Sequence, residues 1–356
     1  MFSLIVSLIL GISHGIADAA AGFLLASLPR TMSLEQASFM IIIYNILGFG
    51  YQPLVGILTD KLKRPRLSVS IGLFSLLLAL ILASWQIKLA VILAGIGSAA
   101  FHVGAGALAL AATPNSTIGP GLFAAPGVLG LAIGGVLGLA GYSVTLPLVL
   151  LLGLAIGIIA IFERLRLPKY NGIFRFTGIK EDRCISLTEK SKNLQDNDLS
   201  LLILIGAIAI ISTVWTSFQF LLQTHFDIII NLAVAAAIAK VFGGIIAEKW
   251  GWWRWTMVSL IMATILLLIR GQNHLPLVLG LALLQSTIPI TLTATARIMP
   301  QQPATATGFA LGLAILLGGI PIILGFSYIA ATPVISALLV VTTLLLFRWG
   351  AGFTEL

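Results

Sequence analysis

Residues 56–66 read GILTDKLKRPR, and residues 244–254 read GIIAEKWGWWR. In each stretch a glycine stands four positions before an acidic residue, a lysine follows the acid directly, and an arginine comes six positions after it. Each copy lies at the end of a long apolar segment, the second such segment of its half of the chain. The repeat therefore predicts two structurally related halves.

The composition indicates a membrane protein. Of 356 residues, 59% are hydrophobic and 9% are charged, and the mean hydropathy is +1.09. Soluble domains are about 45–50% apolar. Runs such as 201–212 and 338–347 are continuously apolar, which favours membrane-spanning helices over the alternating strands of a barrel. We therefore predict an all-α polytopic membrane fold.

Charges, prolines and polar clusters divide the chain into about twelve apolar segments of spanning length. They are residues 3–26, 34–58, 67–85, 88–110, 119–141, 143–163, 199–222, 226–247, 253–270, 274–296, 304–325 and 328–348. We interpret the first as a retained span, because no basic residues precede its apolar run as they would in a signal peptide. The predicted organisation is a six-helix half at 1–163, a polar linker at 164–198 and a second six-helix half at 199–356.

Basic residues are concentrated in two predicted loops. The chain has 20 Lys and Arg against 12 Asp and Glu, and most of the basic residues fall within 59–66 and 164–198. Cytoplasmic loops are enriched in Lys and Arg, so we expect both loops and both termini in the cytoplasm. The net charge of +8 then reflects orientation in a lipid bilayer and not a nucleic-acid partner. The single cysteine, Cys184, excludes an intramolecular disulfide.

The stretch from Gly56 to Arg64 resembles the loop signature of the major facilitator superfamily. The resemblance implies two six-helix halves, secondary transport, and a gating role for Gly56, Asp60, Arg64, Gly244, Glu248 and Arg254. Glycine lets two helices approach closely. Asp60 is expected near the N-terminus of the span that begins at 304, and Glu248 near the start of the fifth span, because a helix dipole favours a carboxylate there. The alternative is that both acids only cap a basic loop.

Residues 10–140 resemble most closely the fosmidomycin-resistance group of bacterial drug-efflux carriers. The matching residues are Ser13-His14 with Asp18, Tyr51-Gln52-Pro53 leading into Thr59-Asp60-Lys61, and Gly95 to His102. The resemblance implies efflux, and we expect a bacterial inner membrane. The chain departs from the group at Val103, where the group has proline, and at Gly134-Gly135, where its antiporter signature ends in Gly-Pro.

Three ionisable residues are expected near the middle of the bilayer. His14 and Asp18 are four residues apart and share one helix face, and His102 lies at mid-depth of the fourth span. An ionisable group in hydrocarbon needs a partner or water, and a histidine beside an aspartate suits proton coupling. We predict that His14, Asp18 and His102 carry the proton; the alternative is a structural cluster that only fixes helix packing.

Other polar residues are candidates for the substrate cavity. They are Tyr44, Asn45 and Gln52 in the second span, Trp215 and Gln219 in the seventh, and Gln285 in the tenth. For each of them, packing is the alternative. We expect the side chain of Lys240, in the eighth span, to snorkel to water at the cytoplasmic end; the alternative is an anion-binding role.

These patterns predict a proton-coupled secondary transporter that exports a small organic molecule by alternating access. The alternatives are a nutrient-uptake symporter and a carrier-like assembly subunit that does not transport. We find no nucleotide-binding loop and no zinc-protease motif, so we expect neither an enzyme, nor a cofactor, nor a metal site. The expected partners are the substrate, protons and the lipid bilayer, and the expected state is a monomer.

Overall fold

The computed structural model describes residues 2–164, 187–270 and 274–349. Within these ranges the regular structure is helical throughout. Ten helical segments are long and apolar enough to cross a membrane, and two shorter apolar helices lie at Thr145–Ile161 and Pro333–Arg348. Large apolar side chains such as Leu54, Phe74 and Phe242 are exposed on the outer helices, as expected for a surface that contacts lipid. The all-α polytopic fold is confirmed.

The first half follows the predicted spans closely. Its elements are α1 (Phe2–Ser27), η1 (Leu28–Arg30), α2 (Leu34–Asn45), η2 (Ile46–Gly50), α3 (Gln52–Leu62), α4 (Pro65–Leu82), α5 (Ile87–Ala112), α6 (Ile118–Ala140) and α7 (Thr145–Arg164). The second predicted span is made of α2, η2 and α3 in series. η2 is a π-helix, and Pro53, three residues after its end, supplies no backbone N–H.

The second half contains more interruptions. Its elements are α8 (Leu187–Leu222), α9 (Phe226–Trp250), α10 (Trp252–Ile269), α11 (His274–Gln285), α12 (Ile288–Ile298), α13 (Pro303–Thr307), η3 (Gly308–Leu313), α14 (Ala314–Ile323), α15 (Ser327–Ala330) and α16 (Pro333–Trp349). The predicted tenth span is broken after Gln285, with Pro289 in the first turn of α12. The last span begins at Pro333, later than predicted, because proline suits the first turn of a helix and not its interior.

The predicted linker at 164–198 lies largely outside the described residues, and so does Cys184. α8 begins at Leu187, so the helix that carries the seventh span starts twelve residues earlier than predicted.

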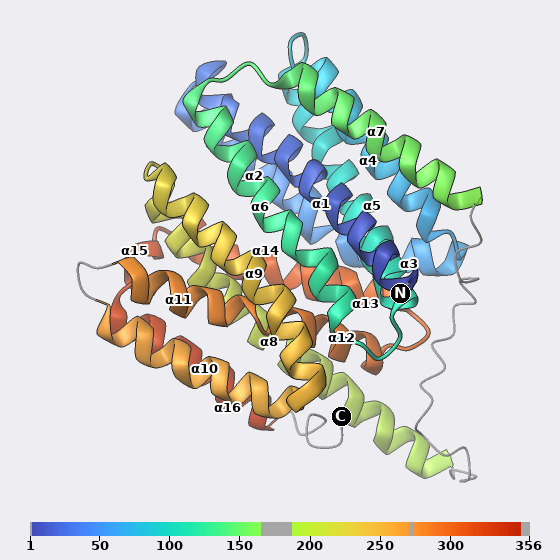
Figure 1. The fold of residues 1–356 in the computed structure, drawn as a ribbon, viewed down its shortest axis with the longest axis vertical. Coiled ribbons are helices and arrows are strands. Elements are labelled where there is room, and N and C mark those ends of the chain that lie inside the picture. The colour runs from blue at the N-terminus through green and yellow to red at the C-terminus, as the bar shows by residue number, and fades with distance from the viewer. Residues whose placement is uncertain (1, 165–186, 271–273, 350–356) are drawn as a thin grey trace.

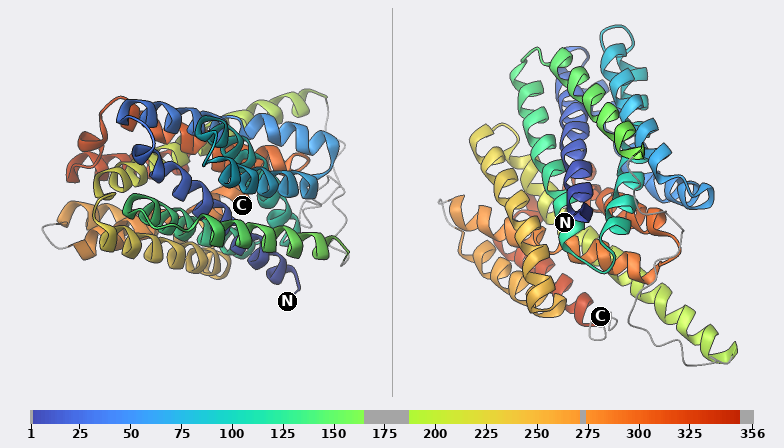
Figure 2. Two further views of the ribbon diagram at one scale, coloured as in Figure 1. Left: turned by 90° about the horizontal axis from the view of Figure 1, so that it is seen from above. Right: turned by 45° about the vertical axis from the view of Figure 1, so that its right-hand side comes forward.

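The two halves lie side by side, with the blue-to-green helices in one group and the yellow-to-red helices in the other (Figures 1 and 2). α6 packs against α1 of its own half and against α9 of the other. At a second contact, α13 packs against α3 and α5. α5 and the segment formed by α11 and α12 are the most deeply buried spans of the two halves. α1 and α6 touch backbone to backbone, because a Cβ on Gly130 would overlap Gly15.

Candidate functional site

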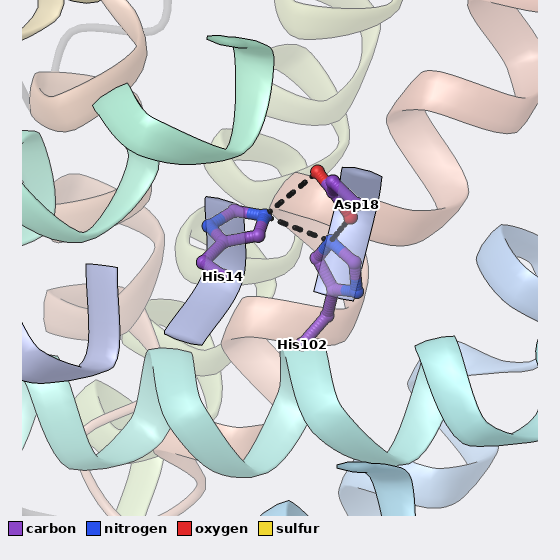
Figure 3. Close-up of side chains that lie close together, drawn as sticks. All are labelled: His14, Asp18 and His102. Atoms are coloured by element: carbon purple, nitrogen blue, oxygen red, sulfur yellow. Dashed lines mark hydrogen bonds and ion pairs between the residues drawn. The ribbon is translucent and has the colours of Figure 1, made fainter. Parts of the chain in front are cut away.

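The predicted triad of ionisable residues is assembled at the contact between α1 and α5. His14 and Asp18 lie one turn apart on α1, and His102 projects from α5 towards them (Figure 3). The Asp18 carboxylate lies 3.1 Å from His14 Nε2 through one oxygen and 3.4 Å from His102 Nε2 through the other. The two Nε2 atoms are 2.9 Å apart. All three residues therefore meet in one cluster.

Backbone carbonyls fix the outer nitrogen of each ring. His14 Nδ1 lies 2.9 Å from the carbonyl oxygen of Phe123, and His102 Nδ1 lies 2.8 Å from that of Ser98. A carbonyl only accepts hydrogen bonds, so the hydrogen-bond network assigns a hydrogen to each Nδ1. In the neutral form of either ring, Nε2 then carries a lone pair.

This assignment determines the charge of the cluster. A hydrogen bond between the two Nε2 atoms at 2.9 Å needs a proton on one of them, and with a hydrogen on each Nδ1 that proton would make the ring an imidazolium. The adjacent Asp18 carboxylate balances that charge. With one such proton the cluster would be neutral overall, which is the least costly charge state inside a membrane.

The same atoms fit a metal ion less well. One ligand atom from each of the three residues lies within 4.8 Å of the others. Two imidazole nitrogens on a tetrahedral zinc ion would be roughly 3.3 Å apart. The observed 2.9 Å between the Nε2 atoms instead matches a nitrogen–nitrogen hydrogen bond.

Aromatic rings and a glycine enclose the histidine pair. Phe123 stacks on His14 with ring centroids 4.6 Å apart, and Phe101 packs against His14 and His102 at 5.9 and 5.8 Å. A Cβ on Gly127 would lie 2.5 Å from Cε1 and from Nε2 of His14. The rings exclude water from one side of the pair, and Gly127 leaves the space that the His14 ring occupies.

Two further titratable groups lie within electrostatic range of Asp18. One is the buried Tyr44 on α2, and the other is Lys240 on α9 of the second half. Lys240 is 9% exposed, and its Nζ lies 3.5 Å from the carbonyl oxygen of Ala124 on α6. The prediction that this side chain snorkels to water is therefore wrong, because it is held against α6.

The other predicted cavity residues have separate surroundings. Asn45 donates to the carbonyl of Ile41 in its own helix at 3.0 Å. Gln52 is fully buried and donates to the Gly48 carbonyl at 2.7 Å, while its side-chain oxygen has no hydrogen-bond partner. Trp215 and Gln285 are buried, and Gln219 is half-buried. No interaction that the structure records joins these three to the histidine pair.

The first copy of the repeat connects the two halves. The Asp60 carboxylate accepts hydrogen bonds from the backbone N–H groups of Ala304 and Thr305 at 3.1 and 2.8 Å, and from the Thr305 hydroxyl at 2.8 Å. These groups form the start of α13, where the expected carboxylate contact is thus present. Gly56 makes the approach possible, because a Cβ there would lie 2.7 Å from the Ala304 carbonyl oxygen.

The second copy makes the equivalent contact, with the carboxylate in the second half and the hydrogen-bond donors in the first half. The Glu248 carboxylate accepts hydrogen bonds from the Ser116 hydroxyl at 2.6 Å and from the Thr117 N–H at 3.3 Å, directly before α6. A Cβ on Gly244 would lie 2.6 Å from the Thr117 carbonyl oxygen. The two arginines predicted to take part in gating, Arg64 and Arg254, are exposed.

The family follows from a comparison of the sequence with known families. The sequence profile described as Major Facilitator Superfamily matches residues 4–326. The chain belongs to this superfamily. It is therefore a multi-pass integral membrane protein of a superfamily of transporters that carry small molecules and are generally not enzymes. Among curated proteins, none matches the sequence.

Solved structures of the superfamily share the fold. The Escherichia coli fucose:proton symporter FucP matches with a TM-score of 0.68 at 13% identity, covering 99% of both chains. A FucP structure in the outward conformation gives 0.69 at 16% identity, covering 98% of this chain and 99% of that one. The human organic anion transporter MFSD10 gives 0.68 at 15% identity, covering 97% and 98%. These matches establish the superfamily fold.

Three contributors to the site have weak sequence signals or none. Phe123 and Ser98 act through backbone carbonyls, which every residue has. Gly127 acts through the absence of a side chain. The pair Pro126-Gly127 is visible in the fifth span, but only the position of His14 shows why glycine is needed there.

Proposed function

We propose that this protein is a proton-coupled secondary transporter of a small organic molecule, and that His14, Asp18 and His102 carry the proton. The observation that supports the proposal is the 2.9 Å separation of the two Nε2 atoms, a hydrogen-bond distance at which the rings can share one proton. The histidine pair and Asp18 form a neutral cluster with that proton and an anionic cluster without it.

Loss of the proton changes the energetics of the helix contact between α1 and α5. The two Nε2 lone pairs would then repel each other, and the Asp18 charge would be unbalanced in a buried site. The histidine rings must separate, or water must enter. Protonation therefore favours a different arrangement of α1 and α5 from deprotonation, which is the requirement for coupling a proton to alternating access.

Asp60 and Glu248 serve as gates in this proposal. Each carboxylate joins one half of the molecule to the start of a helix in the other half. Opening this end requires both sets of hydrogen bonds to break. Such charge-assisted bonds contribute about 1.5–3 kcal/mol each, less where water screens them, so the closed state is stable but reversible.

Efflux is our first proposal for direction, on the resemblance of residues 10–140 to the fosmidomycin-resistance carriers. The second candidate is uptake by proton symport, which is favoured by the structural likeness to a fucose:proton symporter. For both, we place the protein in a bacterial inner membrane with the Asp60 loop and the termini in the cytoplasm.

The test is a proton-flux assay in liposomes that contain the purified protein and a proton-sensitive dye. Phosphonates, lipophilic cations and sugars are added in turn. We expect one compound to drive a pH change that Asp18→Asn and His102→Gln abolish and that His225→Gln, an exposed histidine at a helix end, leaves intact. The sign of the pH change distinguishes antiport from symport.

Equal flux in wild type and Asp18→Asn would contradict the coupling role. Silence for every compound, with the protein shown to be folded, would favour the carrier-like assembly subunit that does not transport.

A further inference from the structure

Lys240 is a buried lysine with no ion-pair partner among the described residues. It is the only lysine or arginine among the buried polar residues in the part of the chain that the structure describes. Its ammonium group can donate three hydrogen bonds. Among the described residues, its one recorded acceptor is the Ala124 carbonyl oxygen, at 3.5 Å, the outer limit of a hydrogen bond.

Asp18 and two arginines of neighbouring helices all have other partners. Asp18 is the carboxylate that acts on it electrostatically, but its two oxygens lie against His14 and His102. Two arginines at the ends of neighbouring helices have aromatic partners: Arg297 stacks over Trp252 at 3.9 Å and Arg270 over Phe218 at 4.5 Å. For Lys240, no carboxylate within 4.0 Å and no ring contact is recorded among the described residues.

The position of Lys240 excludes ready access to water. It lies ten residues before the end of α9, about 15 Å along the helix. His102 lies ten residues before the end of α5. The Glu248–Thr117 hydrogen bond places the start of α6, just after α5, against the end of α9. Lys240 and His102 therefore lie at similar depth, in different halves of the molecule.

α6 connects Lys240 with the proton-carrying cluster. Two consecutive backbone carbonyls of α6 contact His14 and Lys240. The Phe123 carbonyl accepts a hydrogen bond from His14, and the Ala124 carbonyl oxygen lies 3.5 Å from Lys240 Nζ. Pro126, two residues after Ala124, supplies no N–H to the helix, which loosens the backbone at this point. A group bound at Lys240 would therefore lie close to the histidine pair.

We propose that Lys240 binds an oxyanion of the transported substrate, so that the protein carries small organic acids with a carboxylate or a phosphonate group. This inference rests on the proposed transport function and names its substrate class. A monoanion at Lys240 would leave the buried site neutral overall, because the protonated cluster is neutral already. The loaded site then crosses the low-dielectric interior without unbalanced charge.

The experiment measures ligand-induced thermal stabilisation of the full-length protein in detergent. The probes are lactate and the methylphosphonate monoanion, each beside a neutral analogue: lactamide and dimethyl methylphosphonate. The variants are Lys240→Gln, Lys240→Arg and, as a control on the same helix, the exposed Lys249→Gln.

We expect at least one acid, and not its neutral analogue, to stabilise the wild type and the Lys249→Gln and Lys240→Arg variants. Lys240→Gln should need about ten- to a hundredfold more of that acid. The identity of the effective acid distinguishes carboxylate from phosphonate. If Lys240→Gln does not fold, the stabilisation by each acid is compared with that by its neutral analogue in the wild type and in Lys240→Arg. Stabilisation of both proteins by the acid alone supports the inference.

Three results would overturn the inference: stabilisation by acid and neutral analogue alike, an unchanged response in folded Lys240→Gln, or no stabilisation of the wild type by any acid. The proposed function fails separately. Acid binding that depends on Lys240, without any proton flux, would contradict proton coupling and still support the anion site. Proton flux that is driven by a neutral compound and is unaffected by Lys240→Gln would support proton coupling and contradict the anion site.

Discussion

His14 Nε2 and His102 Nε2 lie 2.9 Å apart, although 88 positions of sequence separate the two residues. The Nδ1 atom of each ring contacts a backbone carbonyl oxygen, that of Phe123 on α6 for His14 and that of Ser98 on α5 for His102. Both rings are thus fixed by Nδ1 and free to exchange a proton at Nε2. Asp18 contacts both Nε2 atoms, and in the proposed mechanism its carboxylate balances the charge of the proton that they share.

The space for the His14 ring depends on Gly127. Substitution Gly127→Ala would bring a methyl group 2.5 Å from the ring and displace it. We expect a loss of stability of about 1–3 kcal/mol from overpacking and loss of substrate-driven proton flux. Melting temperature and liposome flux are the measurements.

Gly135→Ala is the matched control, because nothing lies within 4 Å of a Cβ at that position of the same helix. We expect its stability to change by less than about 0.5 kcal/mol. Equal behaviour of the two alanine variants would show that the ring is not tightly confined.

The gate can be tested at Asp60. Asp60→Asn removes the charge that Ala304 and Thr305 contact. We expect a shift of about 1–2 kcal/mol, roughly five- to thirtyfold, towards the state that is open at this end. Spin labels at the exposed positions 61 and 301, in a Cys184→Ser background, would report a larger share of long distances.

Glu248→Gln should act in the same direction at the symmetry-related contact. Glu35→Gln, at an exposed residue in the first turn of α2, should leave the distance distribution unchanged. A distribution that Asp60→Asn does not alter would show that the Asp60 contact is no gate.

Much of the fold and part of the site could be predicted from the sequence. Apolar length located the spans, and the repeat at Gly56 and Gly244 located the two contacts between the halves. The four-residue spacing of His14 and Asp18 placed them on one face. These features are local or periodic, so they are visible in a single sequence.

What could not be predicted depends on tertiary packing. The meeting of His102 with His14 requires the relative rotation of α1 and α5, which no local pattern specifies. The burial of Lys240 depends on the packing of α9 against α6, where its ammonium group contacts the Ala124 carbonyl. The amides Gln219 and Gln285 are polar residues in spans, as His102 is, yet only His102 joins the cluster.

The most direct test of the shared proton is nitrogen-15 NMR of histidine-labelled protein at neutral pH. The chain has four histidines, so His14→Gln and His102→Gln assign the two signals. We predict that His14 and His102 both carry hydrogen on Nδ1, that together they hold one additional proton on Nε2, and that Asp18→Asn releases it. Two neutral rings with no additional proton, or rings that carry hydrogen on Nε2 and none on Nδ1, would contradict the account.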